Sequence, residues 1–228
     1  MNVLVIDIGG SHVKLRVPGK TARRKFDSGP DATPGQLVAQ AVETAKGWSY
    51  DAVSIGFPSV VEDGRIMSNP KNLRPGWVGF DFEQHFGKPV RIINDAAMQA
   101  LGSYRGGRML FLGLGTGLGS AMISDGVLMP LELSNMRHSK THTIEDVLGK
   151  RGLKRIGFEA WELEVREAVR VLRAVFVTDY IVLGGGNVKL IKRLPPGTVR
   201  GENNHAFLGG KRLWDIPPKS KKREWRIV

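Results

Sequence analysis

The chain opens with two strands joined by a glycine turn, and this arrangement limits the folds available to it. An apolar run at residues 3–6 leads to Asp7, and Gly9-Gly10-Ser11 then precedes an alternating run at 13–17. Two adjacent glycines permit the backbone angles of a tight turn and let backbone N–H groups approach a ligand closely. An acid at the end of the first strand can face a metal or a phosphate-bound water. Phosphate transfer from a nucleotide or a polyphosphate is therefore the first function to consider.

Short apolar strands alternate with helical segments along the chain, which predicts an α/β fold. The strand–glycine turn–strand pattern recurs around Gly113, so we expect two similar halves, 1–95 and 96–228, facing a shared cleft. The patterns predict further strands at 52–57, 90–93, 109–112, 120–123 and 180–183, and helices at 34–46, 96–101 and 158–177.

Two further glycine clusters follow strands. In the first, Gly115, Thr116 and Gly117 can turn successive N–H groups toward an anion, although a purely structural hairpin turn is the alternative. The cluster lacks the third glycine of a dinucleotide fingerprint, where Leu118 stands, and no Gly-Lys-Ser/Thr follows as in a P-loop. The second cluster, Gly184 to Asn187, can lie flat against a nucleotide base or ribose.

Asn94-Asp95 ends an apolar strand and opens a helix. Ligands of open α/β sheets gather at the carboxyl ends of strands, where an Asp can act as a general base for an attacking hydroxyl. Helix capping is the alternative role for this pair, because Asn and Asp are both good capping residues.

The composition limits the kinds of binding partner and the cellular compartment that fit this chain. The 228 residues carry a net charge of +12, concentrated after Lys150, which favours polyanionic partners or merely a solubilising surface. The absence of cysteine excludes disulfides and thiolate zinc sites and fits a cytoplasmic protein. We expect no membrane span, no signal peptide and a loosely ordered basic tail at 219–226. His138 and His142 are four residues apart, but without a third ligand they indicate loop histidines rather than a metal site.

Five motifs in order resemble those of the ROK sugar kinases, and their closest likeness is to the polyphosphate glucokinase branch. They are Asp7-Ile8-Gly9-Gly10-Ser11, Asn94-Asp95-Ala96-Ala97, Gly113 through Ser120, Asp125-Gly126 and Leu183-Gly184-Gly185-Gly186-Asn187. The resemblance extends from Asn2 to about Asp215. It implies an actin-like, ribonuclease-H-like fold with two α/β domains around a central cleft.

The resemblance also implies roles for individual residues. Asp95 would be the catalytic base that deprotonates the 6-hydroxyl of a hexose such as glucose. Asn94, Asn72, Glu132 and Asn135 are the candidates for holding the sugar. The donor, ATP or polyphosphate, would be bound by Asp7, Gly9, Gly10, Ser11, Lys14, Gly115, Thr116, Gly117, Gly185, Gly186 and Asn187. Mg²⁺ would accompany the phosphates, through water near Asp7, and no zinc is expected.

One segment departs from the family pattern. Members usually carry Glu-x-Gly-His after the hairpin, with Glu and His touching the sugar, whereas Ser134 and Asn135 follow Glu132 here. The leading hypothesis is a glucokinase-like enzyme. The alternative is a kinase-like protein that binds sugar or polyanion with little catalysis. Nucleic-acid binding is a weaker third hypothesis, because no aromatic-interleaved basic motif is present. A homodimer is left open.

Overall fold

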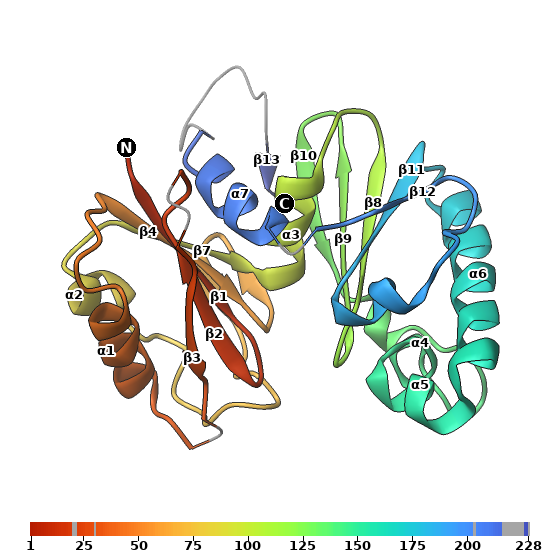
Figure 1. Ribbon diagram of the computed structural model, residues 1–228, viewed down its shortest axis with the longest axis horizontal. Helices are drawn as coiled ribbons and strands as arrows, with labels where there is room; N and C mark the ends of the chain where they lie inside the picture. Colours follow the sequence, from red (N-terminus) through yellow and green to blue (C-terminus); the bar gives the residue numbers. More distant parts are fainter. Residues whose placement is uncertain (20–21, 30, 203, 216–225, 228) are drawn as a thin grey trace. The chain divides into compact units, whose positions relative to one another are not determined.

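The computed structural model describes residues 1–19, 22–29, 31–202, 204–215 and 226–227. These residues form two compact units (Figure 1). The first unit contains Met1–Gly102 and the segment that begins at Ala206, and the second contains Ser103–His205 and β13 (Arg226–Ile227). The structure thus divides the chain at Gly102 instead of Asp95. Of the predicted basic tail, residues 219–225 lie outside the described part of the chain.

The first unit is built on a five-stranded sheet in the order β3-β2-β1-β4-β7. Strands β1, β4 and β7 run parallel to one another. Strand β2 pairs antiparallel with β1, and β3 pairs antiparallel with β2. All residues of β1 and β4 are buried, as expected for parallel strands that are covered on both faces. The strand bounds are Val3–Ile8 (β1), His12–Arg16 (β2), Arg24–Asp27 (β3), Ala52–Phe57 (β4) and Val90–Asn94 (β7), with a separate small hairpin of Val61–Glu62 (β5) and Arg65–Ile66 (β6).

Helices α1 (Pro34–Thr44) and α2 (Phe82–Phe86) lie on one face of this sheet, and α3 (Asp95–Ser103) and α7 (His205–Arg212) lie on the other (Figure 1). The predicted start of α1 is confirmed, because Thr33 and Gln36 form a complete capping box. The helix ends at Thr44, two residues before the predicted end.

The C-terminal helix α7 belongs to the first unit because its glycines let it approach the sheet and α3 closely. A Cβ atom on Gly209 would collide with the Met98 carbonyl, and one on Gly210 would collide with Val5. Beyond the helix, Trp214 donates its indole N–H to the Ser54 hydroxyl over 2.8 Å. Helix α3 extends two residues beyond the predicted end at 101, and the buried Gly102 lies at the contact with α7.

The second unit has a six-stranded sheet in the order β12-β11-β8-β9-β10-β13. Strand β8 pairs parallel with β11 and antiparallel with β9, so the predicted hairpin around Gly115 is confirmed. The strand bounds are Met109–Leu114 (β8), Leu118–Ser124 (β9), Val127–Leu131 (β10), Tyr180–Gly184 (β11) and Thr198–Arg200 (β12).

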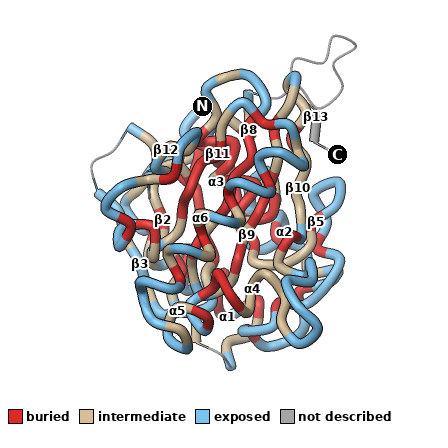
Figure 2. Tube along the Cα trace, turned by 90° about the vertical axis from the view of Figure 1, so that its right-hand side faces the viewer, coloured by how far each residue is buried: buried red, intermediate tan, exposed pale blue. Residues whose placement is uncertain are grey.

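Helix α6 (Phe158–Val175) covers one face of this second sheet. Its buried stripe of Trp161, Val165, Val169 and Leu172 is the predicted apolar face, and it packs with β8 and β11 in the core (Figure 2). The remaining helical elements are η1 (Leu133–Asn135), α4 (Ile144–Leu148), α5 (Lys150–Ile156) and η2 (Gly186–Leu190). No helix among the described residues is long and apolar enough to cross a membrane.

Candidate active site

The glycine turn of the first unit joins β1 to β2 and carries a buried acid at its base. The Gly9 amide donates to the His12 carbonyl over 3.0 Å and closes the turn. Asp7, with 7% of its surface exposed, lies opposite Lys14 in the strand register, and the Lys14 ammonium is 3.1 Å from Asp7 Oδ2. The structure therefore brings a carboxylate and a cation together at the predicted phosphate turn.

The loop that contains Asn72 packs against this turn. A Cβ atom on Gly10 would lie 3.2 Å from the Cβ of Asn72, so the glycine is what allows the loop to approach. Asn72 also lines a hollow of about 500 Å³ together with the cations Lys71 and Arg74. Ser11, the last turn residue, accepts a hydrogen bond from the Ser28 amide over 3.1 Å. This cluster joins residues from β1, β2 and the loop before α2. Because these segments are far apart in the sequence, no local pattern predicts that they meet.

Strand β7 ends at Asn94, and α3 begins at Asp95. The Asn94 side chain caps the helix, because its Oδ1 accepts from the Ala97 amide over 3.1 Å. Its amide nitrogen donates to the Ser59 carbonyl over 3.2 Å. Asp95 is partly exposed, and its Oδ1 accepts from the adjacent Ala96 amide over 2.7 Å. Capping thus falls to Asn94, and both of its polar side-chain atoms are bonded to backbone.

The register places Asp95 near the carboxyl edge that also carries Asp7. Asp7 pairs with Gly56, and Gly56 pairs with Ile93, across three adjacent parallel strands. Neighbouring strands are about 4.8 Å apart, so the two acids lie on the order of 10 Å apart along this edge. A Cβ atom on Gly56 would meet the end of the Met98 side chain of α3, so this glycine lets the Met98 side chain pack against β4.

The residues around Asp7 fit a cation that is held largely by phosphates and water. Magnesium is usually bound by one or two carboxylates, with substrate phosphates and several waters completing its octahedron. Asp7 uses Oδ2 for Lys14, and its other oxygen makes no hydrogen bond within the described residues. The described residues contain no group of three or more His, Cys, Asp or Glu side chains that could hold a metal ion. The donor set therefore fits a single carboxylate contact.

The second glycine turn joins β8 to β9, and two residues distant in sequence hold it. The Gly115 amide donates to the Gly117 carbonyl over 3.1 Å. The Glu145 carboxylate accepts from the Leu118 amide over 3.1 Å, and the Lys150 amide donates to the Gly115 carbonyl over 3.0 Å. This anchoring fixes the turn from the α4–α5 side.

The third glycine cluster lies directly beside the second. Gly184 pairs with Gly113 in parallel strands, and the Asn187 side chain donates to the Gly115 carbonyl over 3.2 Å. Gly185 has a φ of +82°, and a Cβ atom there would collide with the Leu114 backbone. The second unit thus gathers Gly115, Thr116, Gly117, Gly185, Gly186 and Asn187 at one edge of its sheet.

The altered family segment follows β10. The buried Ser120 hydroxyl donates to the Leu131 carbonyl and accepts from the Leu133 amide, which fixes the start of η1. Glu132 is exposed, and the Ser134 hydroxyl donates to its Oε2 over 3.2 Å. Asn135 is exposed. The serine that replaces the family glycine therefore contacts the carboxylate proposed to hold sugar.

Sequence reasoning missed Glu145 and Lys150. Both lie more than twenty-five residues from the turn that they anchor, and no local pattern marks them. The capping box at Thr143 and Asp146 does mark the start of α4 and could have placed Glu145 in its first turn. His138 and His142 lie in a loop, where His138 is 3.5 Å from Glu164.

A model of the ROK family matches residues 3–130, which is more than half of the chain. The polyphosphate glucokinase of Mycobacterium tuberculosis (strain CDC 1551 / Oshkosh) is 24% identical over 206 residues, covering 79% of this chain and 76% of that protein.

Two solved structures share the fold. The inorganic polyphosphate/ATP-glucomannokinase of Arthrobacter sp. strain KM has a TM-score of 0.78 at 23% identity, covering 93% of this chain and 97% of that one. A ROK family glucokinase from Streptomyces griseus, in complex with glucose and AMPPNP, has a TM-score of 0.72 at 18% identity, covering 93% and 99%. These likenesses confirm the expected actin-like fold, and the relatives named here are sugar phosphotransferases, the class expected from the motifs. The chain belongs to the ROK family.

Proposed function

We propose that this protein is a hexose kinase that transfers a terminal phosphoryl group from polyphosphate or ATP to the 6-hydroxyl of glucose or a similar sugar. The observation that carries the proposal is that Asn94 and Asp95, which are neighbours at the end of β7, have different roles. Asn94 supplies the cap of α3, so capping does not account for the acid that follows it. Asp95 stands at the carboxyl edge of a parallel sheet, where an acid can act on a bound ligand.

In the proposed reaction, Asp95 accepts the proton of the sugar hydroxyl while its oxygen attacks the terminal phosphorus. The bond from phosphorus to the bridging oxygen of the donor breaks, and ADP or a shortened polyphosphate leaves. Such transfers depend mainly on positioning and on electrostatic stabilisation of the moving phosphoryl group. Few catalytic side chains are therefore needed beyond the base.

The two glycine turns are the proposed phosphate-binding elements. Asp7, Gly9, Gly10, Ser11 and Lys14 form the one in the first unit, where Lys14 supplies positive charge. When bound, Mg²⁺ would neutralise phosphate charge, and Asp7 would hold it through water. Gly115, Thr116 and Gly117 form the other, with Gly185, Gly186 and Asn187 beside them for the nucleotide.

Exposed cations next to the phosphate elements support polyphosphate as one donor. Lys150 adjoins the second turn through its backbone, and α5 continues with Arg151, Lys154 and Arg155 on its exposed surface. In the first unit, Lys71 and Arg74 line the hollow beside Asn72. A row of cations suits an extended polyanion, because each phosphate carries charge. The polyphosphate glucokinase name of the mycobacterial relative agrees with this choice.

Asn94, Asn72, Glu132 and Asn135 are the proposed sugar contacts. Because the polar atoms of the Asn94 side chain are bonded to backbone, its contribution would be to fix Asp95 or to share its amide with a sugar hydroxyl. The proposed location is cytoplasmic, and a homodimer is the proposed assembly to test.

A second candidate is a protein that binds sugar or polyanion without turnover. The contact between Ser134 and Glu132 favours it, since this hydrogen bond occupies a carboxylate oxygen that a sugar hydroxyl would need. Loss of the family histidine at Asn135 removes a further sugar contact.

A coupled assay distinguishes the two candidates. Purified protein is given glucose, mannose or N-acetylmannosamine with ATP or polyphosphate at low salt, and calorimetry measures sugar binding in parallel. Turnover with at least one sugar and with polyphosphate supports the proposal. Turnover with ATP alone rejects polyphosphate as a donor, and sugar binding without turnover supports the second candidate.

A further inference from the structure

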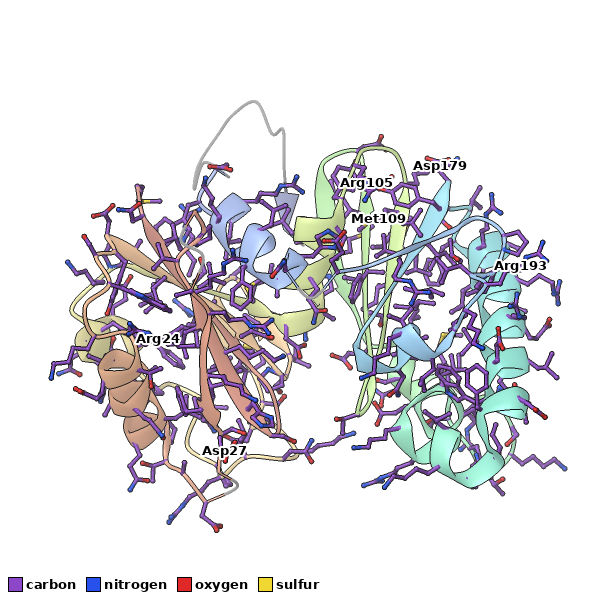
Figure 3. All side chains as sticks on the ribbon, in the orientation of Figure 1. Arg24, Asp27, Arg105, Met109, Asp179 and Arg193 are labelled. Carbon is purple, nitrogen blue, oxygen red and sulfur yellow. The ribbon has the colours of Figure 1, made fainter. Side chains whose placement is uncertain are left out.

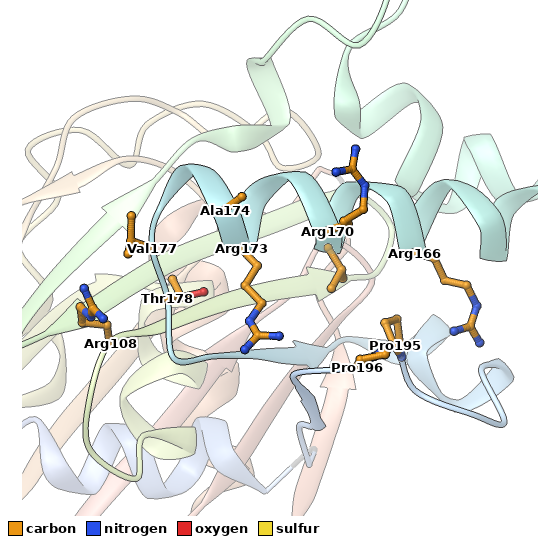
Figure 4. Close-up of a pocket in the computed structure, with 10 residues that line it drawn as sticks. Arg108, Arg166, Arg170, Arg173, Ala174, Val177, Thr178, Pro195 and Pro196 are labelled. Carbon is orange, nitrogen blue, oxygen red and sulfur yellow. The ribbon is translucent and has the colours of Figure 1, made fainter.

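The second unit contains a pocket that lies apart from the glycine turns. It has a volume of about 660 Å³ and is formed by α6 from Arg166 onward, the connection between α6 and β11, and the loop before β12 (Figure 4). Apolar groups from Val169, Ala174, Val177 and two prolines form part of its wall. Four arginines line it as well: Arg108, Arg166, Arg170 and Arg173.

Strand register shows that this pocket and the glycine clusters are at opposite ends of the same sheet. Tyr180 pairs with Met109 at the pocket end, close to Asp179 (Figure 3), whereas Gly184 pairs with Gly113 at the other end. Four steps along β11 at about 3.3 Å each separate the two ends by about 13 Å. A ligand in the pocket would therefore not occupy the proposed donor site.

Three of the arginines have carboxylate partners. Arg108 is 3.1 Å from Asp179, Arg166 is 2.7 Å from Glu162, and Arg170 forms a two-pronged pair with Glu167. The Arg108 and Arg170 pairs are exposed to solvent, which limits their strength, whereas the Arg166 pair is partly buried.

Arg173 is different from the other three. Its guanidinium makes no hydrogen bond or ion pair with any residue that the structure describes, and this side chain lies against the backbone of Gly197. Gly197 has a φ of +74°, and a Cβ atom there would collide with the guanidinium. The loop before β12 thus leaves room for the Arg173 guanidinium, whose charge helps to lower the pKa of Asp179 although the two side chains form no ion pair.

A buried hydroxyl without a partner lies at the same pocket. Thr178 has 6% of its surface exposed, and its Oγ1 makes no hydrogen bond within the described part of the chain. Figure 4 shows this oxygen on the side of the residue where Arg173 lies. Buried polar atoms are nearly always hydrogen-bonded, so an unpaired one beside an unpaired cation indicates a missing acceptor. An oxyanion can accept from both groups at once.

We propose that this pocket binds an organic phosphate, with the phosphate on Arg173 and Thr178 and the apolar part on Val169, Ala174 and the prolines. The apolar wall distinguishes this ligand from a bare inorganic anion, which gains nothing from apolar surface. Arg108 borders the pocket and adds positive charge beside the phosphate. The inference does not depend on the proposed kinase activity, since it uses none of the residues assigned to catalysis.

Phenyl phosphate is a suitable probe, because it joins a phosphate to a small apolar ring. Hydrogen–deuterium exchange on the full chain would locate binding, and calorimetry would measure affinity. We expect protection of residues 173–179 and 195–198, with weaker binding of inorganic phosphate and of benzyl alcohol. Protection confined to the glycine turns, or no binding of phenyl phosphate, would overturn the proposal.

Two variants and a control test the named groups. Arg173→Ala should weaken the binding of phenyl phosphate at least about tenfold, because a charged hydrogen bond is lost. Thr178→Val should weaken it severalfold without lowering the melting temperature, since it removes a buried hydroxyl that has no partner in the free protein. Arg65→Ala, a matched loss of an exposed arginine on β6, should leave binding unchanged. Wild-type affinity in both pocket variants would overturn the proposal.

Discussion

Gly185 is the residue at which the structure makes its sharpest prediction about the donor site. Its φ of +82° is unfavourable for a residue with a side chain, and a Cβ atom would collide with the Leu114 carbonyl. With ψ at 167°, this backbone conformation is essentially restricted to glycine and costs alanine about 1–3 kcal/mol. Relieving the collision costs about 1–3 kcal/mol more, because the obstacle is backbone in a paired strand. Gly185→Ala should therefore destabilise the second unit by about 2–6 kcal/mol.

Gly186→Ala is the matched control. No atom lies within 4 Å of the added Cβ position, so we expect a change below about 1 kcal/mol. Urea unfolding followed by circular dichroism compares the two variants with the wild type. In folded Gly185→Ala protein, the KM for ATP should rise, since the shifted turn loses the contact of Asn187 with Gly115. Equal stability and equal KM in the two variants would refute the reasoning.

Three further predictions concern the sugar segment, the C-terminal segment and acid stability. Ser134→Gly should lower the KM for sugar severalfold, because it frees Glu132 Oε2, and an unchanged KM would count against a sugar role for Glu132. Trp214→Phe should destabilise the first unit by about 1 kcal/mol through loss of the hydrogen bond to Ser54, measurable by urea unfolding. Hydrogen bonds from the start of β8 lower the pKa of Asp179, so its stabilising effect is present at neutral pH and is lost as pH falls through that lowered pKa. Asp179→Asn should accordingly destabilise the protein more at pH 7 than at acid pH below that lowered pKa, and an equal effect under both conditions would contradict this.

Local patterns were sufficient to predict much of the fold. The alternation around Gly9 and Gly115 predicted both hairpins, and the apolar stripe of α6 predicted the face that is buried. The predicted end at Val177 was two residues late. There the chain leaves the helix in a left-handed conformation, with Val177 at φ +49° and the Thr178 amide bonded to the Arg173 carbonyl. A valine gives no sequence signal for such a turn, which glycine usually supplies.

The parts that sequence did not predict depend on distant contacts. Helix α7 joins the first unit because Gly209 and Gly210 fit against α3 and β1, which are about a hundred residues or more away in the chain. Glu145 and Lys150 hold the second phosphate turn through single hydrogen bonds. The pairing of Ser134 with Glu132 likewise depends on the three-residue η1 turn. Periodicity carries no information about such contacts.

The kcat of Asp95→Asn, measured with glucose and with polyphosphate or ATP at saturation, tests the central claim most directly. The variant keeps the size and the α3 contacts of the wild type, so it should fold with unchanged stability. Loss of the base predicts a fall in kcat on the order of a hundredfold or more with either donor. A folded Asp95→Asn protein with near-normal kcat would contradict the assignment of Asp95 as the base.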